Sequence, residues 1–152
     1  MEPHSQDGVS ITRATKGDFP EIAEVWEASV RATHHFLSEA DIAFLRPLIL
    51  SDYLAAVELR CARGGDGRIL GFVGVAGENV EMLFLAPESR RRGLGRALMR
   101  AAVDELGARR VDVNEQNPAA LGFYEHLGFK VVGRSPVDGQ GRPFPLLHLE
   151  LA

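Results

Sequence analysis

A basic, glycine-containing segment near the middle of the chain has the residue types of an anion-binding loop. It lies between a predicted strand that ends at Pro87 and a predicted helix over residues 93–106, and it comprises Arg90, Arg91, Arg92, Gly93, Leu94 and Gly95. The first turn of a helix leaves about four backbone N–H groups without partners and carries about half a positive charge. Because glycine has no side chain, an anion can approach these N–H groups closely. The segment is therefore suited to bind a phosphate group.

Two common phosphate-binding motifs do not describe this segment. No lysine followed by a hydroxyl residue stands after the glycines, and the two glycines are one short of the dinucleotide-binding pattern. Two other interpretations stay open: a glycine turn with solvated arginines, and a nucleic-acid-binding patch. The net charge of −4 and the lack of aromatic residues among the arginines argue against the second, so we expect no nucleic-acid partner.

The elements that would position this loop alternate between strands and helices. Residues 18–21 and 38–41 have the residue types of helix-capping boxes, and Pro47 should kink or break the second helix. Hydrophobic spacing predicts helices that begin near residues 18, 38, 93 and 118, and strands over 9–14, 57–62, 68–76, 80–86, 111–114, 129–133 and 146–151. This order predicts a mixed α/β sheet with a meander in its middle.

Length and composition predict one domain over residues 1–152, with residues 1–8 as a flexible tail. The chain has 152 residues, of which 45% are hydrophobic and 25% charged. Cys61 is the only cysteine, which excludes an internal disulfide and a cysteine-rich zinc site. No secretory signal or membrane-spanning run is present, so we expect a cytoplasmic protein without a membrane partner. Residues 1–59 carry a net charge of −6 and the remainder +2, which fits a cationic substrate and an anionic cofactor; charged side chains that are merely solvated at the surface are the alternative explanation.

Two blocks of the sequence resemble the GNAT superfamily of acyl-CoA N-acyltransferases. The first, LFLAPESRRRGLGRALM at residues 83–99, contains R-x-x-G-x-G after a strand that ends in proline, which is the family's coenzyme A signature. The second comprises VDVN at 111–114, NPAA at 117–120 and GFYEHLGF at 122–129. Both blocks stand in the family's order and spacing. The resemblance implies a mostly antiparallel sheet of about seven strands, with helices on both faces and a splay between the fourth and fifth strands.

The resemblance also implies where acetyl-CoA binds as the acyl donor. The pyrophosphate would lie on backbone amides of residues 90–95, with Arg96 at the edge of the site. The pantetheine arm would lie beside the fourth strand like an added strand, against the backbone of Leu83, Phe84 and Leu85. Asn117 matches the asparagine that hydrogen-bonds this arm, although an N-cap role for the following helix is an alternative.

For catalysis, the resemblance identifies Tyr124 as the general acid that protonates the departing thiolate of coenzyme A. A core aromatic side chain is the alternative interpretation of this residue. The general base would be a carboxylate that removes a proton from the acceptor amine. Glu81 is the first candidate, because strand alternation places it on the face of Leu83 and Leu85 unless a bulge intervenes. Glu115 is the second candidate.

The acceptor site is predicted from the family's first two helices, which form one of its walls. His34 and His35 are adjacent there and could bind substrate, act as a base or titrate near neutral pH. A favourable charge at a helix C-terminus is the alternative explanation for them. Trp26 and Phe36 could line the same pocket. We expect no metal, because neighbouring histidines on a helix diverge and no third ligand is evident.

The sequence therefore predicts an N-acetyltransferase that moves an acetyl group from acetyl-CoA to a primary amine by direct transfer in a ternary complex. The alternative is a non-catalytic acyl-CoA sensor or partner-binding module on the same fold. The acceptor is expected to be a small-molecule or peptide amine, and the protein a monomer or homodimer.

Overall fold

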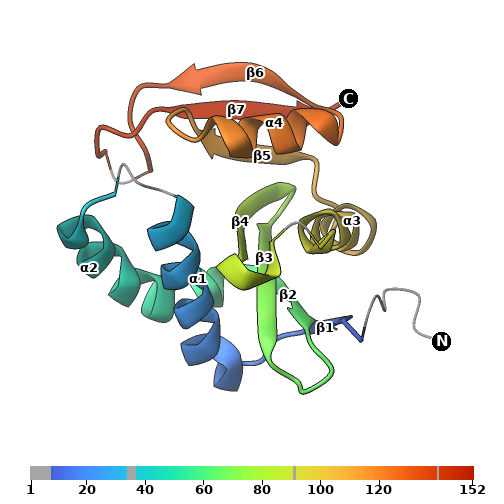
Figure 1. Cartoon of the computed structure of the whole chain (residues 1–152). Helices are drawn as coiled ribbons and strands as arrows, with labels where there is room; N and C mark the ends of the chain where they lie inside the picture. The colour runs from blue at the N-terminus through green and yellow to red at the C-terminus, as the bar shows by residue number, and fades with distance from the viewer. Residues whose placement is uncertain (1–7, 34–36, 91, 140) are drawn as a thin grey trace.

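The computed structural model describes residues 8–33, 37–90, 92–139 and 141–152. Strands and helices follow one another in the predicted order (Figure 1). Among the described residues, no helix is both long and apolar enough to cross a membrane. The elements are β1 (Ser10–Arg13), α1 (Phe19–Thr33), α2 (Glu39–Leu48), β2 (Glu58–Arg63), β3 (Ile69–Ala76), β4 (Asn79–Leu85), α3 (Leu94–Leu106), β5 (Arg110–Asn114), α4 (Pro118–His126), β6 (Phe129–Ser135) and β7 (Leu146–Leu151).

In the described part of the chain, the strands form one 7-stranded sheet in the order β1-β2-β3-β4-β5-β7-β6. All neighbouring strands pair antiparallel except β4 and β5, which are parallel. That parallel pairing is limited to Asn79 opposite Arg110 and Val80 opposite Val111. Beyond Val80, β4 is therefore paired with β3 but not with β5. The predicted mixed sheet with a splay between its fourth and fifth strands is confirmed.

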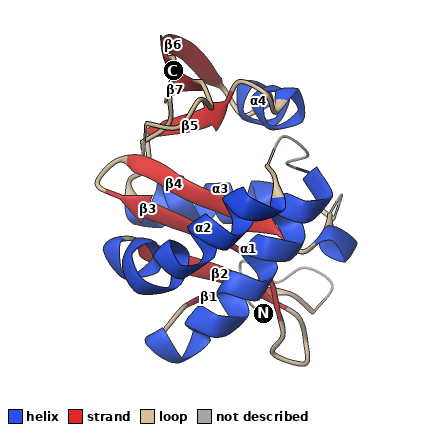
Figure 2. Ribbon diagram, turned by 90° about the vertical axis from the view of Figure 1, so that its left-hand side faces the viewer, coloured by secondary structure: helices blue, strands red, loops and turns tan. Residues whose placement is uncertain are grey.

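Helices cover both faces of the sheet, as predicted (Figure 2). On one face, α1 and α2 pack against side chains of β2, β3 and β4, and on the other face α3 and α4 pack against the central and C-terminal strands. Fully or nearly fully buried side chains fill both layers: Ile22, Trp26, Phe72 and Met82 on the first, and Val73, Leu94, Leu98, Phe129 and Leu149 on the second. The core thus holds β4 between α1 and α3.

The start of the first helix differs from its prediction. Asp18 does not cap a helix that begins there; its carboxylate instead accepts a hydrogen bond from the Thr15 backbone N–H at 2.9 Å, at a 3-10 turn over Lys16–Asp18. Glu21, the other expected member of the box, accepts a hydrogen bond from the Ile69 N–H at 2.9 Å. Its carboxylate therefore joins α1 to β3 instead of closing a cap.

The start of the second helix is as predicted. The Ser38 hydroxyl accepts from the Asp41 N–H at 3.1 Å, and the Asp41 carboxylate accepts from the Ser38 N–H at 2.9 Å. Pro47 lies inside α2, one residue before its end, and does not break the helical path. The chain continues as a π-helical turn over Ile49–Tyr53.

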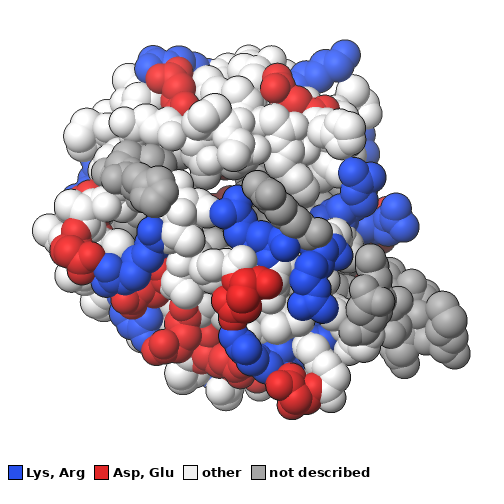
Figure 3. Space-filling view, in the orientation of Figure 1, with Lys and Arg blue, Asp and Glu red and all other residues white. Residues whose placement is uncertain are grey.

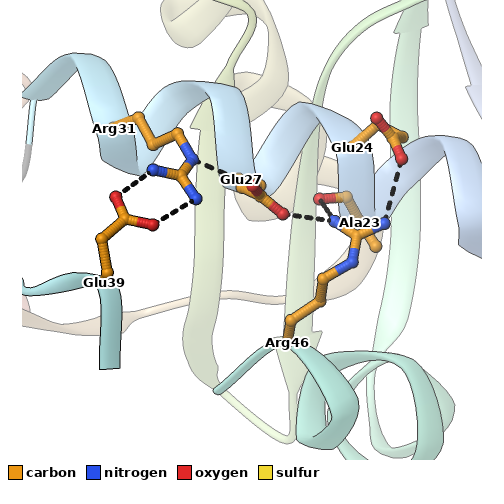
Figure 4. Close-up of polar contacts among 6 residues, drawn as sticks. All are labelled: Ala23, Glu24, Glu27, Arg31, Glu39 and Arg46. Atoms are coloured by element: carbon orange, nitrogen blue, oxygen red, sulfur yellow. Dashed lines mark hydrogen bonds and ion pairs between the residues drawn. The ribbon is translucent and has the colours of Figure 1, made fainter. Parts of the chain in front are cut away.

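Ion pairs join α1 to α2 (Figure 4). Arg31 pairs with Glu27 on its own helix at 2.9 Å and with Glu39 of α2. Arg46 of α2 reaches back to Glu24 at 3.0 Å and to Glu27 at 2.8 Å. Each partly exposed pair contributes at most about 1 kcal/mol, but the pairs share side chains and so restrict the relative position of the two helices.

Candidate active site

An open cleft of about 620 Å³ lies where β4 and β5 diverge. Its walls come from α1, β4, the loop that precedes α3, the first turn of α3, and α4. The side chains of Ser29, Ala32 and Thr33 form the α1 wall. The lining also includes many of the residues predicted to bind the acyl donor or to act in catalysis, namely Leu83, Phe84, Leu85, Arg90, Gly93, Leu94, Gly95, Arg96, Asn117 and Tyr124.

At one end of the cleft, the first turn of α3 presents backbone N–H groups. The first intrahelical hydrogen bond runs from the Ala97 N–H to the Gly93 carbonyl at 3.1 Å, so the N–H groups of Leu94, Gly95 and Arg96 precede it. Gly93 turns the chain into the helix with a φ of 78°, a left-handed conformation that residues with a Cβ rarely adopt. The local geometry therefore matches the predicted anion-binding turn.

The structure gives a different reason for glycine at position 95 from the one expected. The sequence suggests that both glycines clear space for an anion. A Cβ at Gly95 would lie 3.3 Å from Cζ of Phe123, so the space is occupied by an aromatic ring of α4. Gly95 thus lets α4 pack closely against the start of α3, and this contact helps to define the cleft.

Arginine side chains surround this end of the cleft (Figure 3). Arg90 and Arg96 are exposed and line it, whereas Arg92 is exposed but does not line it. Arg91 lies outside the described residues. The positive charge therefore gathers beside the backbone N–H groups of α3, where it would reinforce attraction of an anion.

The middle of the cleft is formed by the part of β4 that β5 leaves unpaired. Leu83, Phe84 and Leu85 pair with Val73, Phe72 and Gly71 of β3, respectively, while no strand in the described part of the chain pairs with their other edge. Backbone groups on such an edge can hydrogen-bond an extended ligand as if it were an added strand. The structure thus presents these residues as the prediction requires.

Asn117 lies where α4 begins. Its Oδ1 accepts a hydrogen bond from the Ala120 N–H at 3.1 Å, and Pro118 occupies the first helical position. The N-cap role that the sequence allowed is therefore present. The side chain also lines the cleft, so the cap places a polar group next to the unpaired edge of β4.

Tyr124 lies on α4 at the inner end of the cleft and is only 6% exposed. Its ring packs edge-on against Phe123 and Phe129, with centroid distances of 5.1 and 5.8 Å. No hydrogen bond joins its hydroxyl to another described residue, and burial alone raises the pKa of the phenol well above its usual value. The group is therefore neutral and holds a proton at neutral pH.

A bulge in β4 changes the expected position of Glu81. Met82 lies opposite Gly74 and Val80 opposite Val75, so Glu81 has no partner on β3. As a result, Val80 and not Glu81 shares the α3-side core with Leu83 and Leu85. The exception that the sequence prediction allowed therefore applies, because one extra residue in a strand reverses the faces that follow it.

The bulge brings Glu81 to a second, smaller cavity of about 110 Å³ between β4 and β5. Asp112, Asn117 and Tyr124 line the same cavity. Although Glu81 keeps an exposed surface, partial burial raises the pKa of its carboxyl, and the nearby Asp112 carboxylate raises it further. The structure therefore brings the candidate base and the candidate acid to one cavity.

Comparison with known proteins places this site in a family. Residues 53–131 match the family model described as an acetyltransferase (GNAT) domain. The peptidyl-lysine N-acetyltransferase YjaB of Salmonella typhimurium is 40% identical over 141 residues, which cover 93% of this chain and 97% of that protein. The chain belongs to the GNAT acetyltransferase family. The predicted family is thereby confirmed, and with it the assignment of the chain as an acetyltransferase.

Solved structures of GNAT proteins share the fold. The solution structure of apo-form YjaB from Escherichia coli superposes with a TM-score of 0.85 at 38% identity, covering 95% of this chain and 97% of that one. PaiA N-acetyltransferase from Thermoplasma acidophilum, solved in complex with coenzyme A, has a TM-score of 0.73 at 21% identity and covers 95% of this chain and 99% of that one. The second likeness concerns the fold alone.

Two other predicted site residues of this GNAT chain that the structure describes, Glu115 and Trp26, line neither cavity. Glu115 forms two hydrogen bonds with Arg134, at 2.6 and 2.9 Å, which lower the pKa of its carboxyl and make it a weaker base than Glu81. Trp26 is 3% exposed and belongs to the core under α1, so it does not line an acceptor pocket. His34, His35 and Phe36 lie outside the described residues.

Asp112 and Phe123 line this site but were not among the predicted site residues. Asp112 is the outward-facing residue of the strand 111–114, between the buried Val111 and Val113, and alternation alone could have indicated it. Phe123 lines the cleft and packs on Gly95. No local signal connects it with the α3 turn, because that contact depends on how α3 and α4 pack.

Proposed function

We propose that the protein transfers the acetyl group of acetyl-CoA to a primary amine, and that the amine is the side chain of a lysine in a protein or peptide. The observation that carries this proposal is the cleft itself. It joins the first-turn backbone N–H groups of α3 at one end to Tyr124 at the other, and Tyr124 and Glu81 meet at the adjoining small cavity. The name of the 40%-identical relative supports lysine as the acceptor.

The residues present fit acetyl-CoA as the donor. The N–H groups of Leu94, Gly95 and Arg96, together with the Arg90 and Arg96 side chains, would hold its pyrophosphate. The unpaired edge of Leu83–Leu85 would hydrogen-bond its pantetheine arm. When bound, the molecule supplies a reactive thioester. The protein supplies orientation and the proton transfers.

The proton transfers are assigned to side chains at the small cavity. Glu81 takes a proton from the acceptor ammonium, so that the amine nitrogen has a free electron pair for attack on the acyl carbon. Its raised pKa makes it a stronger base than an ordinary glutamate. Tyr124 donates its phenolic proton to the leaving sulfur, and its phenolate regains a proton from the nitrogen that has become acylated, which leaves a neutral amide.

Direct transfer is favoured over an acyl-cysteine intermediate. Cys61 lies on β2 and is 0% exposed. Burial raises the pKa of its thiol to about 12, so the nucleophilic thiolate is scarce at neutral pH. A ternary complex with the amine and the acyl donor therefore accounts better for the arrangement of the site.

The test is an acetylation assay with a lysine-containing peptide and acetyl-CoA. We expect release of the coenzyme A thiol and a mass increase of one acetyl group on the peptide. Tyr124→Phe should lower kcat by about 10²- to 10⁴-fold while coenzyme A binding is retained, because the ring stays and only the proton donor is lost. Tyr53→Phe, the other tyrosine of the chain, is the matched control and should keep wild-type kcat.

Two outcomes would contradict the proposal. Tight binding of coenzyme A with no turnover on any amine would favour the non-catalytic sensor. An equal kcat for Tyr124→Phe and Tyr53→Phe would remove the assigned general acid.

A further inference from the structure

Three polar side chains form a continuous hydrogen-bonded row across β5, β7 and β6. Asp112 of β5 lies directly opposite His148 of β7 in the sheet register. The Asp112 Oδ1 is 2.6 Å from His148 Nδ1, and the other ring nitrogen, Nε2, is 2.7 Å from the Ser135 hydroxyl of β6. These residues are far apart in sequence, and only strand pairing brings them together.

The chemistry of the three groups fixes the direction of the hydrogen bonds. An ionised carboxylate can only accept, so Nδ1 of His148 carries the hydrogen that is shared with Asp112. In the neutral ring, Nε2 is then an acceptor and receives the Ser135 O–H. The row thus holds one imidazole orientation, which in turn holds the Asp112 carboxylate at a defined place.

That place is the edge of the small cavity between β4 and β5. Asp112 lines it together with Glu81 and Tyr124. Tyr124 is more than nine-tenths buried, and its hydroxyl has no hydrogen-bonding partner among the described residues. The cavity has about 110 Å³, room for a few non-hydrogen atoms, since a water molecule occupies about 30 Å³ in the liquid. This volume suits the terminal ammonium of an extended side chain.

We propose that Asp112 is the residue that binds the acceptor ammonium in this cavity, and that His148, supported by Ser135, is a positioning residue for the Asp112 carboxylate. This inference rests on the proposed function and names the group that selects a cationic acceptor. The ammonium donates one hydrogen bond to Asp112 and faces Glu81 with another N–H. Glu81 takes that second proton, while the hydrogen bond with His148 holds the Asp112 carboxylate in place.

The test measures equilibrium binding as well as turnover. Nα-acetyl-lysine amide is titrated calorimetrically into the protein saturated with coenzyme A, where no acetyl group is available to react. Asp112→Asn should raise the Kd of the lysine amide about 10- to 100-fold, the loss expected for a charge-assisted hydrogen bond. The Kd of coenzyme A should not change. Glu150→Gln is the matched control, because it removes an exposed carboxylate from β7 two residues from His148.

A second pair of variants tests the role of His148. His148→Ala removes the donor to Asp112 and should raise the Kd of the lysine amide several-fold. His148→Asn keeps an amide N–H near the former Nδ1 position and should restore most of the affinity. A merely structural role would instead lower the melting temperature of both variants without separating lysine-amide affinity from coenzyme A affinity.

The outcomes separate this inference from the proposed function. If the wild-type protein acetylates the lysine amide and Asp112→Asn binds it with an unchanged Kd, the inference is overturned and the proposed function stands. If Asp112→Asn binds the lysine amide more weakly than the wild type does, but the wild type does not acetylate it, the inference is supported and the proposed reaction is rejected. Failure of the wild-type protein both to bind and to acetylate the lysine amide overturns both.

Discussion

At the scale of single residues, the two carboxyl groups that line the small cavity, those of Glu81 and Asp112, have different surroundings. Partial burial and the Asp112 charge both raise the pKa of Glu81 above its ordinary value of 4.5. Asp112 accepts a hydrogen bond from His148, with 2.6 Å between Oδ1 and Nδ1. The raised pKa makes Glu81 a stronger base than an ordinary glutamate.

The raised pKa of Glu81 predicts the acidic limb of the pH profile. Glu81 acts as a base only when ionised, so kcat/KM should fall as the pH decreases through its raised pKa, which lies above 4.5. Glu81→Gln should lower kcat about 10²-fold or more and abolish this limb. The measurement is kcat/KM against pH at saturating acetyl-CoA. An unchanged limb in Glu81→Gln would assign the titration to another group.

At the scale of elements, the left-handed turn at Gly93 controls how α3 begins. Its φ of 78° is available to glycine at little cost, whereas an L-residue there is strained by about 1–2 kcal/mol. The N–H groups that follow it point in directions set by this turn. A backbone change at Gly93 therefore affects both stability and binding of the donor.

Gly93→Ala should lower the free energy of unfolding by about 1–2 kcal/mol and raise the KM for acetyl-CoA. Urea unfolding and initial-rate kinetics measure the two effects. Gly122→Ala, in α4, is a matched control: a Cβ there meets no atom within 4 Å, and alanine favours a helix by about 1 kcal/mol. A Gly93→Ala protein with wild-type KM would mean that this turn does not shape the donor site.

The reciprocal cap at the start of α2 gives a second prediction for an element. Ser38→Ala removes the acceptor for the Asp41 N–H and should cost about 0.5–2 kcal/mol of unfolding free energy. Ser38→Asp keeps a capping acceptor and should retain most of the stability. Chemical denaturation of the three proteins distinguishes a lost cap from a general effect of substitution.

At the scale of the whole molecule, the connection between β6 and β7 contacts α2 through Arg142. Arg142 pairs with Asp41, which is 7% exposed, and its guanidinium lies 4.9 Å from the centre of the Phe44 ring. This contact joins the C-terminal strands to the helices on the other side of the cleft. It therefore limits how far the two halves of the sheet can separate where β4 and β5 are unpaired.

Arg142→Ala should destabilise the fold by about 3 kcal/mol, because it leaves the nearly buried Asp41 carboxylate without its charged partner. Arg142→Lys keeps the charge but not the planar stacking on Phe44, and should recover part of the loss. Thermal unfolding measures both. An unfolding free energy for Arg142→Ala within about 0.5 kcal/mol of the wild type would show that the halves are held together by other contacts.

Much of the fold and part of the site could be predicted from the sequence. The order of elements, the caps at Ser38 and Asn117 and the turn at Gly93 depend on hydrogen bonds and hydrophobic spacing within a few residues. The two motif blocks contain the predicted donor-binding residues, and those that the structure describes lie along one cleft, except Arg92. Interactions between residues that are close together in the chain can be predicted from the sequence, because the residue types and their spacing specify them.

The tertiary structure decided the features that depend on packing and strand register. The bulge at Glu81, the burial of Trp26 and the contact of Phe123 with Gly95 each arise from how one element meets another. The row of Asp112, His148 and Ser135 exists because β7 lies between β5 and β6, which joins residues 36 positions apart. The sequence by itself determined the family and the proposed donor loop, whereas the side chains proposed to face the acceptor were set by strand pairing, since a shift of one residue would turn them to the other face.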